Sequence, residues 1–156
     1  MARDSSVMPT DSTAVSTGSH LTIIGNTQRT AEGNVQLVSC LAAGTALGRT
    51  PDPLHINGRD VGGLPFGYQA GVAGAASLNN LGIFVRVSGL VTSVDGRNWR
   101  YWIDDGSALS QTPGRSGLMV IAYGPPLPTQ GTRVTVVGFA QITSPDGAPA
   151  LYEAPH

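Results

Sequence analysis

The chain contains no lysine. Its nine basic residues are all arginines, ten residues are acidic, and the formal net charge is −1. Proteins that bind nucleic acid regardless of its sequence carry a clear basic excess, because contacts to phosphates supply most of their affinity. The charge balance therefore argues against a protein of that class. Charged residues together make up only 12% of the chain, about half of the usual share.

Cysteines and long apolar runs are scarce as well. Cys40 is the only cysteine, which excludes a disulfide within one chain and a metal site built from several thiolates. No apolar run is long enough to span a membrane, and residues 1–6 lack the apolar core of a signal peptide. We expect an extracellular or cell-surface protein, whose numbered chain begins after processing or inside a longer product, because the composition is weakly charged and rich in Ser and Thr.

Glycine and proline are abundant, with 21 and 11 residues, and the composition divides the chain into four parts. Residues 1–19 form a polar tail. Residues 20–41 contain two β-prone runs around a polar turn, which predict a β-hairpin. Residues 42–80 show no sustained periodicity and predict an extended connector rich in Gly and Pro. Residues 81–156 show the alternation expected of a β-barrel.

The predicted hairpin at residues 20–41 needs a larger sheet to join, because a single hairpin is marginally stable in water. That sheet belongs either to the barrel of the same chain or to a neighbouring molecule. Leu21 and Ile23 lie in the first strand of the hairpin. We expect them to make assembly contacts.

The connector carries too many apolar side chains to leave in water. Four of them are candidate assembly contacts: Leu54, Ile56, Phe66 and Tyr68. A segment of this length without regular structure is uncommon in a compact domain, and it indicates a stretch that packs flat against another surface. That surface is either the chain's own barrel or a second molecule, and the sequence leaves both open.

Five β-prone segments follow the connector and are separated by turns. They cover residues 83–92, 98–104, 118–123, 133–140 and 150–153. In the first segment, branched aliphatic residues occupy every second position, and Gly89 marks a bend or bulge. The pattern predicts an all-β fold whose main part is a small five-stranded barrel.

Two stretches resemble the OB-fold. The end of the second segment and the turn after it read IDDGS at residues 103–107, and the start of the fourth segment with the two residues before it reads GTRVTVVG at residues 131–138. The chain is most similar to OB-fold domains of large bacterial extracellular and cell-surface proteins, and the hairpin resembles the last two strands of a preceding degenerate copy. The resemblance implies a Greek-key barrel. The sequence departs from the family where residues 124–131 leave little room for the helix that often follows the third strand.

The first two barrel segments carry the one surface with binding character. If Trp99, Tyr101 and Ile103 point into the barrel, alternation turns their neighbours outward. The candidate binding or interface residues on this outward face are Arg86, Leu90, Arg100 and Trp102. In OB-folds this face holds single strands of nucleic acid or sugars, which stack on aromatic rings. Exposed Trp and Arg are equally common anchors of protein interfaces.

No nucleophile elbow, phosphate-binding loop or dinucleotide motif occurs, and the three histidines stand in separate segments. We therefore expect no catalysis, no cofactor and no metal site. The features that need partners favour a homopolymer, namely a structural subunit of an extracellular filament or surface fibre joined by strand addition and connector packing. The alternative is an OB-fold module that binds single-stranded nucleic acid or an oligosaccharide.

Overall fold

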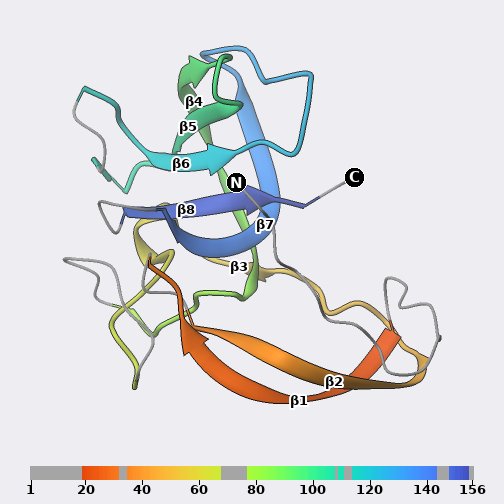
Figure 1. Ribbon diagram of the computed structural model, residues 1–156. Helices are drawn as coiled ribbons and strands as arrows, with labels where there is room; N and C mark the ends of the chain where they lie inside the picture. The colour runs from red at the N-terminus through yellow and green to blue at the C-terminus, as the bar shows by residue number, and fades with distance from the viewer. Residues whose placement is uncertain are drawn as a thin grey trace.

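The computed structural model describes residues 19–31, 35–67, 77–107, 109–110, 114–143 and 148–154. Within these residues the chain forms two β-sheets and one short 3-10 helix (Figure 1). The larger sheet closes into a barrel, and the smaller sheet is a two-stranded hairpin. Apart from Ser19, the predicted polar tail lies outside the described residues.

The barrel consists of the five strands that the alternating pattern predicts. They are β4 (Phe84–Asp95), β5 (Arg100–Asp104), β6 (Leu118–Ile121), β7 (Arg133–Thr143) and β8 (Ala148–Glu153). Their order is β4-β5-β6-β8-β7, and β4 also pairs with β7, which closes the barrel. β6 and β8 run parallel, whereas the other neighbours are antiparallel. The predicted all-β fold with an OB-like Greek-key barrel is confirmed.

β4 takes part in both halves of the barrel because it is long. Its first part, Phe84–Leu90, pairs with β7, and its second part, Leu90–Asp95, pairs with β5. Val85, Val87 and Val91 point inward and are buried. Buried and outward side chains therefore alternate along β4 as the strand passes from β7 to β5.

Gly89 does not form a bulge, because it pairs in regular register with Val134 of β7. The irregularity in the pairing of β4 with β5 lies further along, between Val91 and Ser93. A Cβ atom on Gly89 would stand 2.8 Å from the carbonyl oxygen of Asp104. Glycine at this position therefore lets the backbones of β4 and β5 approach each other closely.

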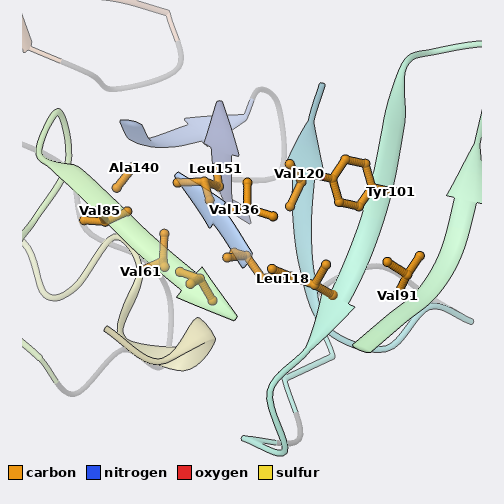
Figure 2. Packing of buried hydrophobic residues seen from close by; sticks show 11 residues of the cluster. Val61, Val85, Val91, Tyr101, Leu118, Val120, Val136, Ala140 and Leu151 are labelled. Atoms are coloured by element: carbon orange, nitrogen blue, oxygen red, sulfur yellow. The ribbon is translucent and has the colours of Figure 1, made fainter. Parts of the chain in front are cut away.

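Aliphatic side chains and one tyrosine fill the barrel (Figure 2). The buried cluster consists of Val61, Val85, Val87, Val91, Tyr101, Ile103, Leu118, Val120, Val136, Ala140 and Leu151. All of these come from barrel strands except Val61, which belongs to the connector and is fully buried. Complete burial of a side chain of this size contributes about 1.5 kcal/mol or more. This part of the connector thus packs on the chain's own barrel.

Tyr101 brings a hydroxyl group into this cluster. The hydroxyl donates a hydrogen bond of 3.5 Å to the carboxylate of Glu153. Burial, and then the negative charge of Glu153, raise the pKa of Tyr101 well above its ordinary value of 10.0. The phenol therefore stays protonated, and its ring packs as part of the core.

A short strand and one helical turn hold the connector against the barrel. β3 (Leu54–His55) pairs in parallel with β4, and the 3-10 helix η1 (Gly58–Asp60) follows it. The carboxylate of Asp105 accepts a hydrogen bond of 2.6 Å from the backbone N–H of Gly58. The side chain of Asn80 is buried, donates a hydrogen bond to the backbone carbonyl of Asp60 and accepts one from the backbone N–H of Gly62.

Acid is expected to loosen this attachment through Asp105. Partial burial alone would raise the pKa of its carboxyl, but hydrogen bonds from Ser107 and from the N–H of Gly58 outweigh burial and lower the pKa below 3.8. The ionised carboxylate therefore stabilises the fold fully above pH 3.8, and this stabilisation is lost as the pH falls through the lowered pKa.

The matching experiment is urea unfolding of the parent and of Asp105→Asn, each at about pH 5 and at about pH 2. The free energy of unfolding should fall less between these two pH values in Asp105→Asn than in the parent. Asp52→Asn serves as the control, because Asp52 is exposed and its ion pair is with the equally exposed Arg49, and it should keep the parental acid dependence. Identical acid dependence in the parent and in Asp105→Asn would contradict the role of Asp105.

The hairpin is longer than predicted. β1 (Ser19–Arg29) pairs antiparallel with β2 (Val35–Leu47), so residues 42–47 belong to this sheet and not to the connector. β2 has 13 residues and β1 has 11, because β2 carries one extra residue at each of two bulges. Figure 1 shows the hairpin, in red and orange, beside the barrel. Among the described strands, β1 and β2 pair only with each other.

Candidate interaction surfaces

Trp102 is buried, although the sequence predicts an exposed ring. Its neighbours in β5, Tyr101 and Ile103, pack in the core, so the side chain of Trp102 points away from the barrel interior, as alternation predicts. On the outer side of the sheet it joins Met119 and Ala150 in a second, smaller cluster, and only 3% of its surface is exposed. The guanidinium carbon of Arg115 lies 4.0 Å from the centre of the Trp102 ring. Arg115 therefore covers the ring that was expected to bind a partner.

Arg115 is held in place from both sides. One of its guanidinium nitrogens donates a hydrogen bond of 2.8 Å to the Oγ of Ser93, and its charge lies over the aromatic face of Trp102 in a cation–π contact. The indole Nε1 of Trp102 is buried without a hydrogen-bond partner among the described residues. Trp99, predicted to point inward, is exposed and has a φ of 53°, in the turn that precedes β5.

The other three predicted binding residues are exposed, but they do not form one cluster. Arg86 lies near the start of β4, beside β3 and β7. Arg100 lies in β5, opposite Asp95 at the far end of β4. Leu90 stands between them, where β4 passes from β7 to β5. A single ligand that touched all three would have to follow the whole length of β4.

A row of apolar side chains that the sequence did not reveal crosses the outside of the barrel. Phe84 of β4 lies opposite Phe139 of β7, Phe139 lies opposite Tyr152 of β8, and Tyr152 lies opposite Ile121 of β6. The two phenylalanine ring centres are 5.1 Å apart, with the rings tilted by 38°. Phe139 and Tyr152 are exposed. We call these four residues the aromatic row.

The hairpin exposes apolar side chains on both of its faces. Ile24 and Leu41 stand opposite each other on one face and are 69% and 57% exposed. Successive side chains of a strand point to opposite faces of the sheet. Leu21 and Ile23, the predicted assembly contacts, are three residues and one residue before Ile24 and therefore lie on the other face. Leu21 is half-buried and Ile23 is exposed. Ala42, which lies opposite Ile23, is buried.

The four predicted connector contacts have different surroundings. Leu54 and Phe66 are exposed. Ile56 is partly buried and packs against the barrel core. Tyr68 lies outside the described residues. Two of these side chains, Leu54 and Phe66, are therefore available on the surface of the described chain.

Within the described ranges, no three His, Cys, Asp or Glu side chains come together in a way that could hold a metal ion. No described helix is long and apolar enough to cross a membrane. Comparisons with protein-family models, with curated proteins and with solved structures find no match to this chain. Its own surfaces are therefore the basis for inferring a function.

Proposed function

We propose that this protein is a non-catalytic structural subunit that assembles with copies of itself into an extracellular filament or surface fibre. The hairpin is the observation that carries the proposal. Its strands of 11 and 13 residues pair only with each other in the described chain, yet both faces expose apolar side chains. An isolated two-stranded ribbon is marginally stable in water. A partner that extends or covers it would therefore stabilise it.

The edges of the hairpin support strand addition as the way in which subunits join. Among the described strands, each strand of the hairpin pairs on one side only, and long edges without charges pair readily with other strands. Natural proteins guard such edges with lysine and proline. This chain has no lysine, and the segment Leu21–Gln28 of β1 contains neither a charged residue nor a proline.

If the hairpins join by a two-fold contact, a filament needs a second, different contact in each subunit, because a two-fold contact alone stops at a dimer. The described chain has exposed apolar side chains outside the hairpin that can form the second contact. They are the aromatic row on the barrel, together with Leu54 and Phe66 on the connector. We assign the first contact to the hairpin and the second to these residues.

The extracellular location rests on composition and on the resemblance to extracellular proteins. Charged residues are few, lysine is missing and a single cysteine is present. The OB-like barrel fits the resemblance to domains of large bacterial extracellular and cell-surface proteins. Neither feature identifies a ligand, since one fold hosts many functions.

Sedimentation velocity over a range of protein concentrations tests self-assembly. We expect polymers that persist from low salt to molar salt, because burial of apolar surface and backbone hydrogen bonds are not screened by ions as surface charges are. A particle that stays monomeric at high concentration, whatever the salt, would exclude a filament subunit.

The aromatic row favours a second candidate function, that of an OB-fold module for single-stranded nucleic acid or an oligosaccharide. Aromatic rings on a sheet stack against bases, and each stacked base contributes about 1–3 kcal/mol. The row ends beside Arg100 of β5, which lies opposite Ile121. A planar ligand on Phe139 and Tyr152 would therefore have a cation near one end.

Replacing Phe139 with alanine tests this second function. If a ligand stacks on the row, Phe139→Ala should weaken its binding about tenfold or more, as measured by titration with a single-stranded oligonucleotide and, separately, with an oligosaccharide. Gln141→Ala is the control, because Gln141 lies two residues further along the same strand and face. Absence of binding to either ligand by the parent chain would exclude this function.

A further inference from the structure

We propose that β1 is the edge through which two copies join, and that β1 of one copy pairs antiparallel with β1 of a second copy. The product is a four-stranded sheet in the order β2-β1-β1-β2, with a two-fold axis at its centre. This inference rests on the self-assembly proposed above, and it specifies which edge and which orientation the first contact uses.

The barrel has no long edge to offer a neighbouring copy. Each of its five strands has a partner on both sides, because β4 and β7 close the sheet. The one further strand that pairs with it, β3, has two residues. Among the described strands of more than two residues, only those of the hairpin therefore have a single strand partner. A strand added from another copy must come from a hairpin and must join a hairpin.

The two edges of the hairpin differ because both bulges lie on β2. Opposite Gly25, β2 has two residues, Ser39 and Cys40, and Ser39 has a φ of 52°. Near the end of the hairpin, Thr45 is a second extra residue in β2. Bulges interrupt the regular spacing of backbone N–H and C=O groups and are a common means of protecting an edge. The edge of β1 is the regular one.

The outer edge of β1 is also accessible. Every residue from Thr22 to Gln28 is exposed, and none of them is charged. Pairing two β1 strands would bring the side chains of Ile23 and Ile24 from both copies together. The exposed apolar faces would then be continuous across four strands, and a sheet of three or more strands with apolar faces is far more stable than a lone hairpin.

The charge pattern of β1 determines the orientation. Arg29 is its one Asp, Glu, Lys or Arg residue, and it stands at the end of the strand. Parallel, in-register pairing would place Arg29 beside Arg29, and like charges in neighbouring strands are destabilising. Antiparallel pairing places the two arginines at opposite ends of the new sheet. It also continues the antiparallel pattern of β1 and β2 and produces a two-fold contact.

A cysteine scan distinguishes the two edges. In a Cys40→Ser background, single cysteines are placed in β1 at Thr22, Ile23, Ile24, Asn26 and Thr27. The matched controls are their partners in β2, which lie directly opposite: Ala43, Ala42, Leu41, Val38 and Leu37. Directly opposite residues of an antiparallel pair have Cβ atoms about 4.5–5.5 Å apart, close to the separation in a disulfide. Mild oxidation of the assembled protein is followed by non-reducing electrophoresis.

Antiparallel pairing of identical strands brings one position opposite itself. We therefore expect a cross-linked dimer at one β1 position, with less at its neighbours, and at least about tenfold less from every β2 position. Polymers that cross-link through β2, or through neither strand, would overturn the choice of β1 while leaving self-assembly intact. Failure of the parent chain to associate at all would overturn the proposed function as well, so the two failures are distinguishable.

A second pair of variants checks the result without cysteines. Thr22→Lys combined with Asn26→Lys places like charges on the edge that we assign to the contact, and it should abolish the hairpin-mediated dimer. Ala43→Lys combined with Val38→Lys places the same charges opposite them on β2, and it should leave the dimer in place. Equal loss in both double variants would contradict the assignment of β1.

Discussion

Replacement of Ile24 by lysine and of Leu41 by glutamate is expected to abolish assembly while the barrel stays folded. The two side chains face each other on one face of the hairpin and are the most exposed apolar residues of its two strands. Burial of an Ile or Leu side chain contributes about 1.5–3 kcal/mol. Loss of Ile24, which lies in the strand that we assign to the contact, should therefore weaken the contact by about tenfold or more. The new opposite charges can pair across the strands, which helps to preserve the hairpin.

Sedimentation velocity measures this loss, and the melting temperature of the barrel provides the internal check. The melting temperature should stay close to that of the parent, since the hairpin pairs with no described barrel strand. Tyr123→Lys is the control, because it places a charge at an exposed apolar side chain of the loop after β6. Polymers that form as readily in the Ile24/Leu41 double variant as in the parent would exclude this face of the hairpin from the assembly.

Gly117→Ala is expected to produce the largest loss of stability in the barrel, about 4 kcal/mol. Gly117 precedes β6 and has a φ of 101°, which side chains rarely adopt. A Cβ atom here would also overlap the backbone carbonyl of Ile103 and lie 2.9 Å from the backbone nitrogen of Asp104. The backbones of β5 and β6 would have to move apart, although both strands supply core side chains.

Urea unfolding followed by near-ultraviolet circular dichroism measures the effect, because Trp102 in β5 is buried and reports on packing there. Gly106→Ala is the matched control: its φ is 90°, and no atom lies within 4 Å of a Cβ added there. It should lose only the conformational cost, on the order of 1 kcal/mol. Equal losses in the two variants would show that the close approach of β5 and β6 is not what requires glycine.

The barrel strands could be predicted because their signal is local. In β4, buried valines alternate with outward side chains, and this period of two is visible in any stretch of a strand that has one face in a core. The closing pair of β4 with β7 was not encoded in such a pattern. Only the structure shows this pairing.

Trp102 shows why alternation does not establish exposure. The pattern correctly assigns the side of the sheet on which Trp102 lies, but it contains no information on what covers that side. Arg115 lies 13 positions further along the chain, in the segment before β6, and returns to stack on the ring. A contact of this kind depends on the path of a loop, which composition and periodicity do not specify.

The aromatic row could not be predicted for a similar reason. Phe84, Phe139 and Tyr152 are far apart in sequence and become neighbours only through the pairing registers of β4, β7 and β8. The outward position of Phe139 could have been inferred from its alternation with buried Ala140. The position of the connector could not be predicted either, because its apolar side chains could pack on the barrel of the same chain or on a neighbouring molecule. The structure places Val61 of the connector inside the barrel core.

Cryo-electron microscopy of the purified chain, in low salt and in strong salt, tests the central claim most directly. The claim is that copies of this protein join through their hairpins, and through a second surface, into an open-ended assembly. We predict regular filaments in both conditions, in which each hairpin forms one four-stranded sheet with the hairpin of a neighbouring subunit. Dispersed single particles in both conditions, or filaments whose hairpins contact no other subunit, would contradict the account.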